Sequence, residues 1–338
     1  MARIREEDYA YATARIRSIE TKLINRSKLE RLLDISDPSD AMKVLMESGY
    51  GTDRLDNSKD GAANVEVLLS SEHKKAYDFL FEILPDPEIA HLFMRRYDYL
   101  NAKLILKAEF LGLDIKRSLS PLGTIKPEVL IRIITERKLS ELPQIFGDAI
   151  SECLDSFAQT GDPQTIDFIL DRASYENMME DAKRTEEPFL VELVERLSDS
   201  ANIRVFIRSK LLSRSGDFIR RALVKGGKLP ENIFEELSDK NIEQFFDAMK
   251  ANGLEKLSQD LSSVVKNPNG LTEVEKVLED SIIVFLGQSK YDIFGVKPVV
   301  AYLFFKETEI KNARLIMTGK TNKISQETIK ERLRLGYA

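Results

Sequence analysis

Polar side chains recur three times along the sequence in one order: leucine, a basic residue, an acidic residue, asparagine and a second basic residue. The first four positions are three residues apart, and the last follows asparagine by two. These residue types form ion pairs and hydrogen bonds. The copies are Leu92, Arg95, Asp98, Asn101 and Lys103; Leu193, Arg196, Asp199, Asn202 and Arg204; and Leu303, Lys306, Glu309, Asn312 and Arg314.

On an α-helix, a step of three residues turns by about 300°, so these side chains stay along one side of the helix. The basic and acidic members can therefore pair, as Arg95 with Asp98 or Lys306 with Glu309. Asparagine is mildly unfavourable inside a helix, so three at matching places indicate a shared hydrogen-bonding role. In the hypothesis that we favour, each asparagine ties its helix to a neighbouring loop or helix of its own domain. In the alternative, the motif helices line a common axis and present these groups to a partner.

A second stretch, Thr318-Gly319-Lys320-Thr321, is similar to the end of a phosphate-binding loop. Such a loop needs a glycine five residues before Gly319, where backbone N–H groups surround the phosphate. Arg314 occupies that position, and a helix rather than a strand precedes the segment. We therefore expect no bound nucleotide here and interpret Gly319 as a helix C-cap.

Histidine and cysteine are too few for the usual metal and nucleophile sites. His73 and His91 are the only histidines and Cys153 is the only cysteine, so neither an intrachain disulfide nor a four-ligand zinc site is expected. We assign surface or packing roles to both histidines and a buried apolar role to Cys153. The sequence predicts no catalytic, cofactor or metal site, and a reducing compartment.

Composition narrows the class of protein further. Of the 338 residues, 43% are hydrophobic and 31% are charged, with a net charge of −6. This is the composition of a globular protein, and the negative charge argues against a nucleic-acid partner. The charged start, Met1–Glu7, is unlike a signal peptide. Since a membrane-spanning helix needs about 20 apolar residues and no run approaches this length, we expect a cytoplasmic protein.

The elements that position the motifs are predicted to be helices throughout. Asp37-Pro38, Asp86-Pro87 and Asp162-Pro163 each place an N-cap acceptor before a proline, which is typical of a helix start. Ser27 with Glu30 and Thr272 with Glu275 have the spacing of capping boxes. The spacing of apolar residues between these signals is helical. We predict an all-α fold of about fifteen helices without a sheet.

The period of the motif indicates the domain organisation. The copies lie about a hundred residues apart, which is the length of a small domain rather than of one solenoid repeat. After the first two copies the sequence also repeats a glycine turn followed by a proline, in Gly123–Pro127 and Gly226–Pro230. We predict three similar helical domains with approximate threefold symmetry, over residues 1–117, 118–224 and 225–338.

Four segments carry a resemblance to a known family. They are Tyr9–Arg17, Ser27–Asp34, Tyr97–Lys103 and Lys306–Lys320, and the last is the most specific. The sequence resembles the C subunit of archaeal and bacterial V-type (A-type) ATPases, which corresponds to the d subunit of the eukaryotic enzyme. The resemblance extends over the whole chain, although the middle third is similar mainly through its repeat.

The resemblance implies a funnel-shaped, all-helical body of three similar domains around a pseudo-threefold axis. It implies a non-enzymatic rotor part of the central stalk, monomeric within the complex, that binds no nucleotide or cofactor. Its partners would be the D- and F-type shaft subunits and the membrane rotor ring, on the cytoplasmic side of the membrane. The alternative is a helical-repeat scaffold for soluble partners. The sequence leaves open whether the first helix packs within its own domain or against the last one.

Overall fold

The computed structural model describes residues 5–51, 61–113 and 118–337. These residues form sixteen α-helices and three short 3-10 helices, and no β-strand is found among them. The predicted all-α fold is confirmed. The predicted domain boundary at residue 117 lies outside the described residues, and the division into three similar domains stays a prediction.

Helix starts show how local sequence sets the elements. Asp37 accepts hydrogen bonds from the N–H groups of Ser39, at 2.7 Å, and Asp40, at 3.3 Å, at the start of α3 (Pro38–Glu47). Proline opens α3 because its missing N–H would have no partner in the first turn. The predicted aspartate–proline start is therefore confirmed here.

The two predicted capping boxes are wrong. α2 (Arg26–Asp34) begins before Ser27, and the side chain of Asn25 is its N-cap, accepting from the N–H of Lys28 at 3.0 Å. α14 likewise begins at Gly270 rather than after Thr272. In both places an asparagine that precedes the predicted box occupies the N-cap position, so each helix is longer than the pattern indicated.

The chain divides into two compact units. The first combines the two ends of the chain, Met1–Pro87 and Val264–Ala338, and the second is Glu88–Ser263. The helices of the first unit are η1 (Glu6–Tyr9), α1 (Ala10–Glu20), α2 (Arg26–Asp34), α3 (Pro38–Glu47), α4 (Gly61–Ile83), α14 (Gly270–Gly287), η3 (Gln288–Tyr291), α15 (Val296–Thr321) and α16 (Gln326–Arg332).

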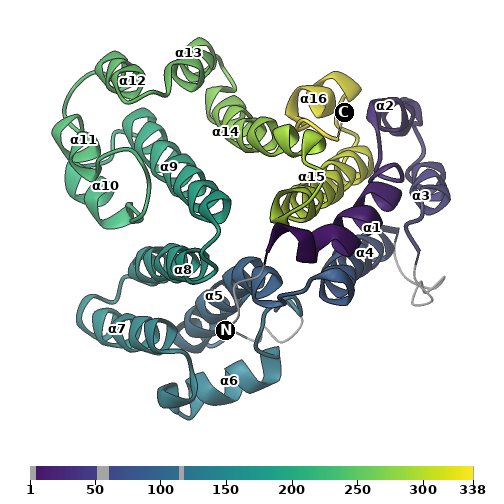
Figure 1. Cartoon of the computed structure of the whole chain (residues 1–338). Helices are drawn as coiled ribbons and strands as arrows, with labels where there is room; N and C mark the ends of the chain where they lie inside the picture. The colour runs from purple at the N-terminus through teal and green to yellow at the C-terminus, as the bar shows by residue number, and fades with distance from the viewer. Residues whose placement is uncertain (1–4, 52–60, 114–117, 338) are drawn as a thin grey trace. The chain divides into compact units, whose positions relative to one another are not determined.

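α15 is the central helix of the first unit. It packs against α1, α2, α3, α4, α14 and α16 (Figure 1). Because neighbours cover it on most sides, its buried residues do not form a single stripe. The first helix, α1, contacts both α15 and α4, which answers the question that the sequence left open.

A single apolar core joins the N-terminal helices of this unit to its C-terminal ones. Leu32 of α2, Leu45 of α3 and Leu68 of α4 lie in one cluster with Ile316 of α15 and Ile329 of α16. All five are almost fully buried, and burial of such a side chain is worth about 1.5–3 kcal/mol. The two ends of the chain therefore stabilise one another.

The second unit is a succession of packed helices. α5 packs against α6 and α8, α7 against α8, α8 against α9, and α9 against α10 (Figure 1). Its elements are α5 (Glu88–Leu111), α6 (Pro127–Thr135), η2 (Leu139–Glu141), α7 (Gln144–Thr160), α8 (Gln164–Arg184), α9 (Pro188–Leu211), α10 (Gly216–Ala222), α11 (Glu231–Glu236), α12 (Ile242–Ala251) and α13 (Glu255–Val264).

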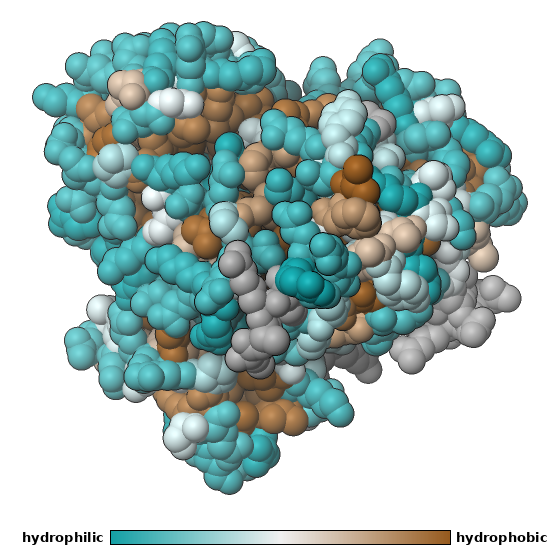
Figure 2. All heavy atoms as spheres, viewed as in Figure 1, coloured by the Kyte–Doolittle hydropathy of each residue, from teal (hydrophilic) through white to brown (hydrophobic). Residues whose placement is uncertain are grey.

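Two apolar groups hold this unit together. One is a cluster from α5 to α8 that includes Leu106, Leu130, Ile150 and Leu170. The other is aromatic, with the ring of Phe206 on α9 stacked at 4.1 Å on that of Phe245. On the face shown in Figure 2, hydrophilic side chains predominate, and hydrophobic ones appear between them in separate patches.

Candidate functional site: polar clamps on the motif helices

Each asparagine of the motif holds the main chain of one distant residue with both ends of its amide. The Asn101 side chain donates to Ser120 O and accepts from Ser120 N, both at 2.8 Å. Asn202 does the same to Val224, again at 2.8 Å for both bonds. Asn312 does so to Arg334, at 3.0 and 2.9 Å.

These contacts satisfy groups that would otherwise cost stability. An amide side chain carries one acceptor and two donors, so it can pair with a peptide unit as another backbone does. All three asparagines are buried, and a buried backbone group without a partner is penalised by about 1–3 kcal/mol. In each copy, the asparagine therefore fastens the chain after the motif helix back onto that helix.

The acidic residue holds a second point of the main chain in the first two copies. Asp98 accepts from the N–H groups of Thr124 and Ile125, both at 3.0 Å, and from the Thr124 hydroxyl at 2.6 Å. Asp199 accepts from the N–H groups of Lys228, at 3.2 Å, and Leu229, at 3.0 Å.

Burial and hydrogen bonding act in opposite directions on these carboxylates. Removal from water raises the pKa of Asp98 above its usual value, and the hydrogen bonds from Thr124 and Ile125 only partly offset this. The pKa of Asp199 is raised for the same reason. Both groups accept two backbone N–H bonds, which is the function of an anchor rather than of an acid–base catalyst.

A glycine makes the approach of each aspartate possible. A Cβ atom added at Gly123 would lie 2.1 Å from Asp98 Oδ1, and one added at Gly227 would lie 2.2 Å from Asp199 Oδ1. Any side chain at either position would therefore displace the carboxylate. Both residues belong to the glycine turn that repeats in the sequence. The repeat was recognised from the sequence, but its contact with the aspartate of the motif was not.

The third copy makes the corresponding bond to a different part of the chain. Glu309 accepts from Ile24 N at 2.5 Å, and its other oxygen accepts from the Tyr50 hydroxyl at 2.5 Å. Ile24 lies two residues before the start of α2. Ile125 and Leu229 stand in the same relation to α6 and α11. The acidic residue thus holds the entry to a helix in all three copies.

The first basic residue pairs differently in each copy. Lys306 contacts Glu309 at 2.6 Å, which confirms the predicted pair, and it also contacts Glu72 of α4 at 2.9 Å. The predicted pair of Arg95 with Asp98 is wrong. Asp98 is taken up by the backbone of the following loop, and Arg95 pairs with Glu88 and with Asp181 of α8.

In the second copy, Arg196 pairs with Glu192 on its own helix, at 2.8 Å.

The second basic residue links the motif helix to a packed neighbour in two copies. Lys103 on α5 pairs with Asp171 on α8 at 2.5 Å, and Arg314 on α15 pairs with Glu66 on α4 at 3.0 Å. Arg204 is half-buried on α9, and its Nε atom has no hydrogen-bond partner among the described residues.

The structure places the twelve polar residues of the motif on three helices, α5, α9 and α15, in separate clamps. The partners of the asparagines and acidic residues were not predicted from the sequence; they are Ser120, Val224, Arg334, Thr124, Ile125, Lys228, Leu229, Ile24 and Tyr50.

The segment that is similar to a phosphate-binding loop has another role. Gly319 lies inside α15, so its interpretation as a C-cap is wrong. A Cβ atom there would lie 2.6 Å from Ile329 Cδ1 on α16, so the glycine allows the two helices to pack closely. The Lys320 ammonium donates to Leu33 O at 2.9 Å and to Ile35 O, at the end of α2.

Both histidines contact glutamates, and the cysteine is buried. His73 Nε2 lies 3.1 Å from Glu307 Oε1, and His91 Nδ1 lies 3.0 Å from Glu88 Oε1. Cys153 is fully buried, and burial raises the pKa of its thiol to about 12. Among the described residues, His, Cys, Asp and Glu side chains form no group of three that could hold a metal ion.

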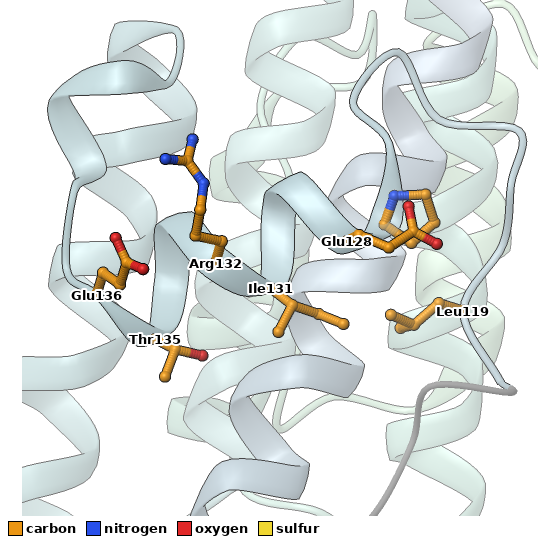
Figure 3. Close-up of a pocket in the computed structure, with 7 residues that line it drawn as sticks. Leu119, Glu128, Ile131, Arg132, Thr135 and Glu136 are labelled. Atoms are coloured by element: carbon orange, nitrogen blue, oxygen red, sulfur yellow. The ribbon is translucent and has the colours of Figure 1, made fainter.

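An open groove of about 440 Å³ runs beside α6 (Figure 3). Leu119, Pro127 and Ile131 provide its apolar part, with Glu128 and Arg132 among the polar lining residues. Arg132 pairs with Glu141 at 2.8 Å. The described residues that line the groove offer no set of converging polar groups such as small-molecule sites use to orient a ligand.

The fold and the clamps define an all-helical protein in which buried polar side chains hold loops in place. Comparison with known proteins identifies the family. Residues 12–332 match the family described as ATP synthase (C/AC39) subunit. Since the match extends over nearly the whole sequence, this chain belongs to that family.

Two relatives illustrate the similarity. The C subunit of the V-type sodium ATPase of Enterococcus hirae is 29% identical, over 95% of this chain and 97% of the relative. The C subunit of the A-type ATP synthase of Methanocaldococcus jannaschii is 25% identical, over 96% of this chain and 86% of the relative. Within the described part of this chain, no helix has the length and apolar character needed to cross a membrane.

Proposed function

We propose that this protein is a non-catalytic rotor subunit in the central stalk of a V/A-type rotary ATPase. It links the D- and F-type shaft subunits to the membrane rotor ring and transmits torque for ATP-coupled proton or sodium transport. It is monomeric within the complex and lies on the cytoplasmic side of the membrane. Family membership and the names of the relatives support the identity of the complex.

The triple clamp is the observation that carries the mechanical part of the proposal. A part that transmits torque must keep its shape under load, and packed helices joined by fixed loops do so better than flexible linkers. In all three copies the asparagine pairs with both backbone groups of one residue, and the acidic residue holds the backbone two residues before the start of a helix. This arrangement stiffens the connections without any reactive group.

Three similar bodies around one axis would also suit a part that turns about that axis. In this proposal the three repeats have the same construction. In the third, Glu309 on the motif helix α15 accepts a hydrogen bond from Ile24 N in the N-terminal segment. The clamps then act inside each repeat.

Reconstitution tests the function. Complexes assembled with and without this chain are compared for ATP hydrolysis and for ATP-driven ion pumping in vesicles. We expect pumping to be lost without the chain while hydrolysis continues, because shaft rotation is no longer passed to the ring. Unchanged pumping in its absence would reject the coupling role, and ATP turnover by the isolated chain would reject the non-catalytic assignment.

A further inference from the structure

Positive charge is concentrated in one stretch of an otherwise acidic chain. Residues 204–228 hold eight lysines and arginines but a single acidic residue, Asp217, whereas the whole chain has a net charge of −6. The stretch begins on α9 and includes α10. Charges of one sign that gather on a surface attract a partner of the opposite sign. A negatively charged partner of the second unit is therefore drawn to this stretch.

Most of these cations have no carboxylate partner within their own unit. Arg220 pairs with Glu235 at 3.5 Å. Lys228 pairs with Glu195, also at 3.5 Å, and the Lys210 ammonium donates to a backbone carbonyl oxygen at 2.6 Å. The other five form no ion pair with the described residues of the unit, and all but the first are exposed. We name them the basic corner: Arg204, Arg208, Arg214, Arg221 and Lys225.

Two arginines of the basic corner lie against aromatic rings. The guanidinium carbon of Arg214 is 5.6 Å from the ring centroid of Phe218 on α10. That of Arg221 is 5.4 Å from the ring centroid of Phe168 on α8, and the two rings meet edge to face at 5.2 Å. A guanidinium that lies over a ring keeps its N–H groups in its own plane, where they can donate to an anion. The rings thus hold both arginines in place without neutralising them.

Local hydrogen bonds fix the backbone of the basic corner, where α8, α9 and α10 contact one another (Figure 1). Arg214 N donates to Ser209 O at 2.8 Å, which closes the end of α9. The Ser215 hydroxyl oxygen accepts from Phe218 N at 3.3 Å as the N-cap of α10. A surface that is ordered before binding loses less entropy when a partner docks.

The other two copies of the motif show which group belongs beside Arg204. Lys103 and Arg314 occupy the same motif position, and each pairs with a carboxylate on a packed helix. The carboxylates are those of Asp171 on α8 and Glu66 on α4. Arg204 has no such partner among the described residues of its unit. The chain itself therefore indicates a carboxylate carried by a helix as the ligand that is missing here.

Apolar side chains are exposed within the same surface. Leu211 is 44% exposed and Leu212 50%, and they lie between Arg208 and Arg214 in the sequence. Arg204 and Arg208 are one turn apart on α9, so their side chains are neighbours. A helix that carries carboxylates one turn apart and apolar residues beside them matches both the charge and the apolar character of this surface.

The surroundings of the basic corner favour a protein over a membrane or a nucleic acid. α11 packs beside α10 and presents Glu231, Glu235 and Glu236, all of them exposed. A flat anionic bilayer would meet these carboxylates together with the arginines, and like charges repel. Arginines already lie over the rings of Phe168 and Phe218, which single-stranded nucleic acid would need for base stacking. A narrow acidic helix meets neither obstacle.

We propose that the basic corner binds an acidic amphipathic helix of a protein partner. Carboxylates of that helix pair with the arginines of the basic corner, and its apolar side chains pack on Leu211 and Leu212. The proposal goes beyond the proposed function and does not depend on which complex contains the partner. Because opposite charges carry the interaction, rising ionic strength weakens it.

The test measures binding of the full chain to a fluorescently labelled helical peptide with glutamates one turn apart and leucines beside them. The wild type should bind this peptide, and it should not bind a matched peptide with lysine in place of glutamate. Arg208→Glu with Arg214→Glu should lower the affinity at least about tenfold, because two attractions become repulsions. Both side chains are exposed, so the melting temperature should change little.

Lys126→Glu with Lys183→Glu is the matched control. Both lysines are exposed on the same unit and lie outside the basic corner, and this variant has the same net charge as the test variant. Since exposed charges farther away than a Debye length are largely screened, the control should bind the acidic peptide within about twofold of the wild type.

A third variant tests the apolar part of the surface. Leu211→Ser with Leu212→Ser keeps every charge, so it should weaken binding of the acidic peptide without changing the dependence on ionic strength. Unchanged affinity in this variant would overturn the assignment of an amphipathic partner.

Several results would overturn the proposal as a whole. Equal weakening by the test and control variants would show that net charge alone governs binding. Preference of the wild type for vesicles with phosphatidylserine, for single-stranded DNA or for a second copy of itself over the acidic peptide would identify another occupant. Absence of binding to the acidic peptide would reject the site, and the proposed function would still stand on the separate pumping assay.

Discussion

At the residue scale, the motif works by replacing backbone partners with side chains. The amide of each asparagine gives and receives one bond with a single peptide unit, as in Asn202 with Val224. Asparagine is unfavourable inside a helix, but here it offsets this cost because it satisfies two buried polar groups of the backbone at once. The hypothesis of a hydrogen-bonding role for asparagine could be formed from the sequence. The residue bound could not, because nothing in the spacing identifies Val224.

Replacing Asn202 by alanine should lower the free energy of unfolding by about 2–3 kcal/mol, since both backbone groups of Val224 lose their partner in a buried site. Urea denaturation measures the change. Asn232→Ala is the control, because the Asn232 side chain bonds only to Glu236 in an exposed place, and it should change stability by less than about 0.5 kcal/mol.

The same variant separates the two hypotheses for the motif. If the asparagine serves its own domain, Asn202→Ala loses stability and still binds shaft and ring below its melting temperature. Loss of partner binding at unchanged stability would instead place the motif at an interface.

Cys153 gives a pH dependence with a defined sign. Its thiol has a pKa of about 12 in the folded protein against about 8.5 in an unfolded chain. Between these values the folded state keeps a proton that the unfolded state releases, so the free energy of unfolding falls as pH rises. From pH 7.5 to 9.5 the contribution is about 1.4 kcal/mol.

Urea denaturation of the wild type and of Cys153→Ala at both pH values measures this contribution. The variant should lose about 1.4 kcal/mol less than the wild type over the interval, because other groups titrate equally in both. Equal losses of stability in the wild type and in Cys153→Ala would show that unfolding does not change the pKa of the thiol.

At the element scale, helices could be predicted more readily than their partners. Aspartate–proline pairs and apolar spacing are local signals, and the all-α fold follows from them. Packing partners are not local. Glu309 bonds to Ile24, at the other end of the chain, and no periodicity connects the two. Gly319 was misinterpreted for the same reason. The side chain that packs against it, Ile329, belongs to another helix, α16.

Replacing Glu309 by alanine should open the N-terminal helices. The change removes the acceptor of Ile24 N and of the Tyr50 hydroxyl and leaves Lys306 with Glu72. We expect a loss of about 3 kcal/mol, as for a broken buried network. Hydrogen exchange should speed up in α2 and α3 more than in α5 and α7.

Glu327→Ala is the matched control for this variant, because it removes an exposed carboxylate from α16 and should leave exchange in α2 unchanged. Equal acceleration in both compact units after Glu309→Ala would contradict the local role of the carboxylate.

At the scale of the whole molecule, the order of the chain and the order of the structure differ. Residues at both ends build one compact unit, whereas the sequence repeat alone suggests three consecutive domains. The copies of the motif mark helices, and the period of a repeat does not fix the residue at which the repeat begins. We therefore propose that each repeat starts at its motif helix, and that the third is completed by the N-terminal segment.

Fragments of the chain test this arrangement. Residues 1–87 contain Leu32, Leu45 and Leu68, which share their core with Ile316 of α15. Alone, this fragment should not unfold cooperatively, because its apolar face has lost that partner. Co-expressed with residues 264–338, it should form a one-to-one complex with a cooperative thermal transition, because burial of these side chains, at about 1.5–3 kcal/mol each, needs both pieces. Cooperative folding of residues 1–117 alone would favour consecutive domains, since that fragment contains α1–α5 and lacks α15.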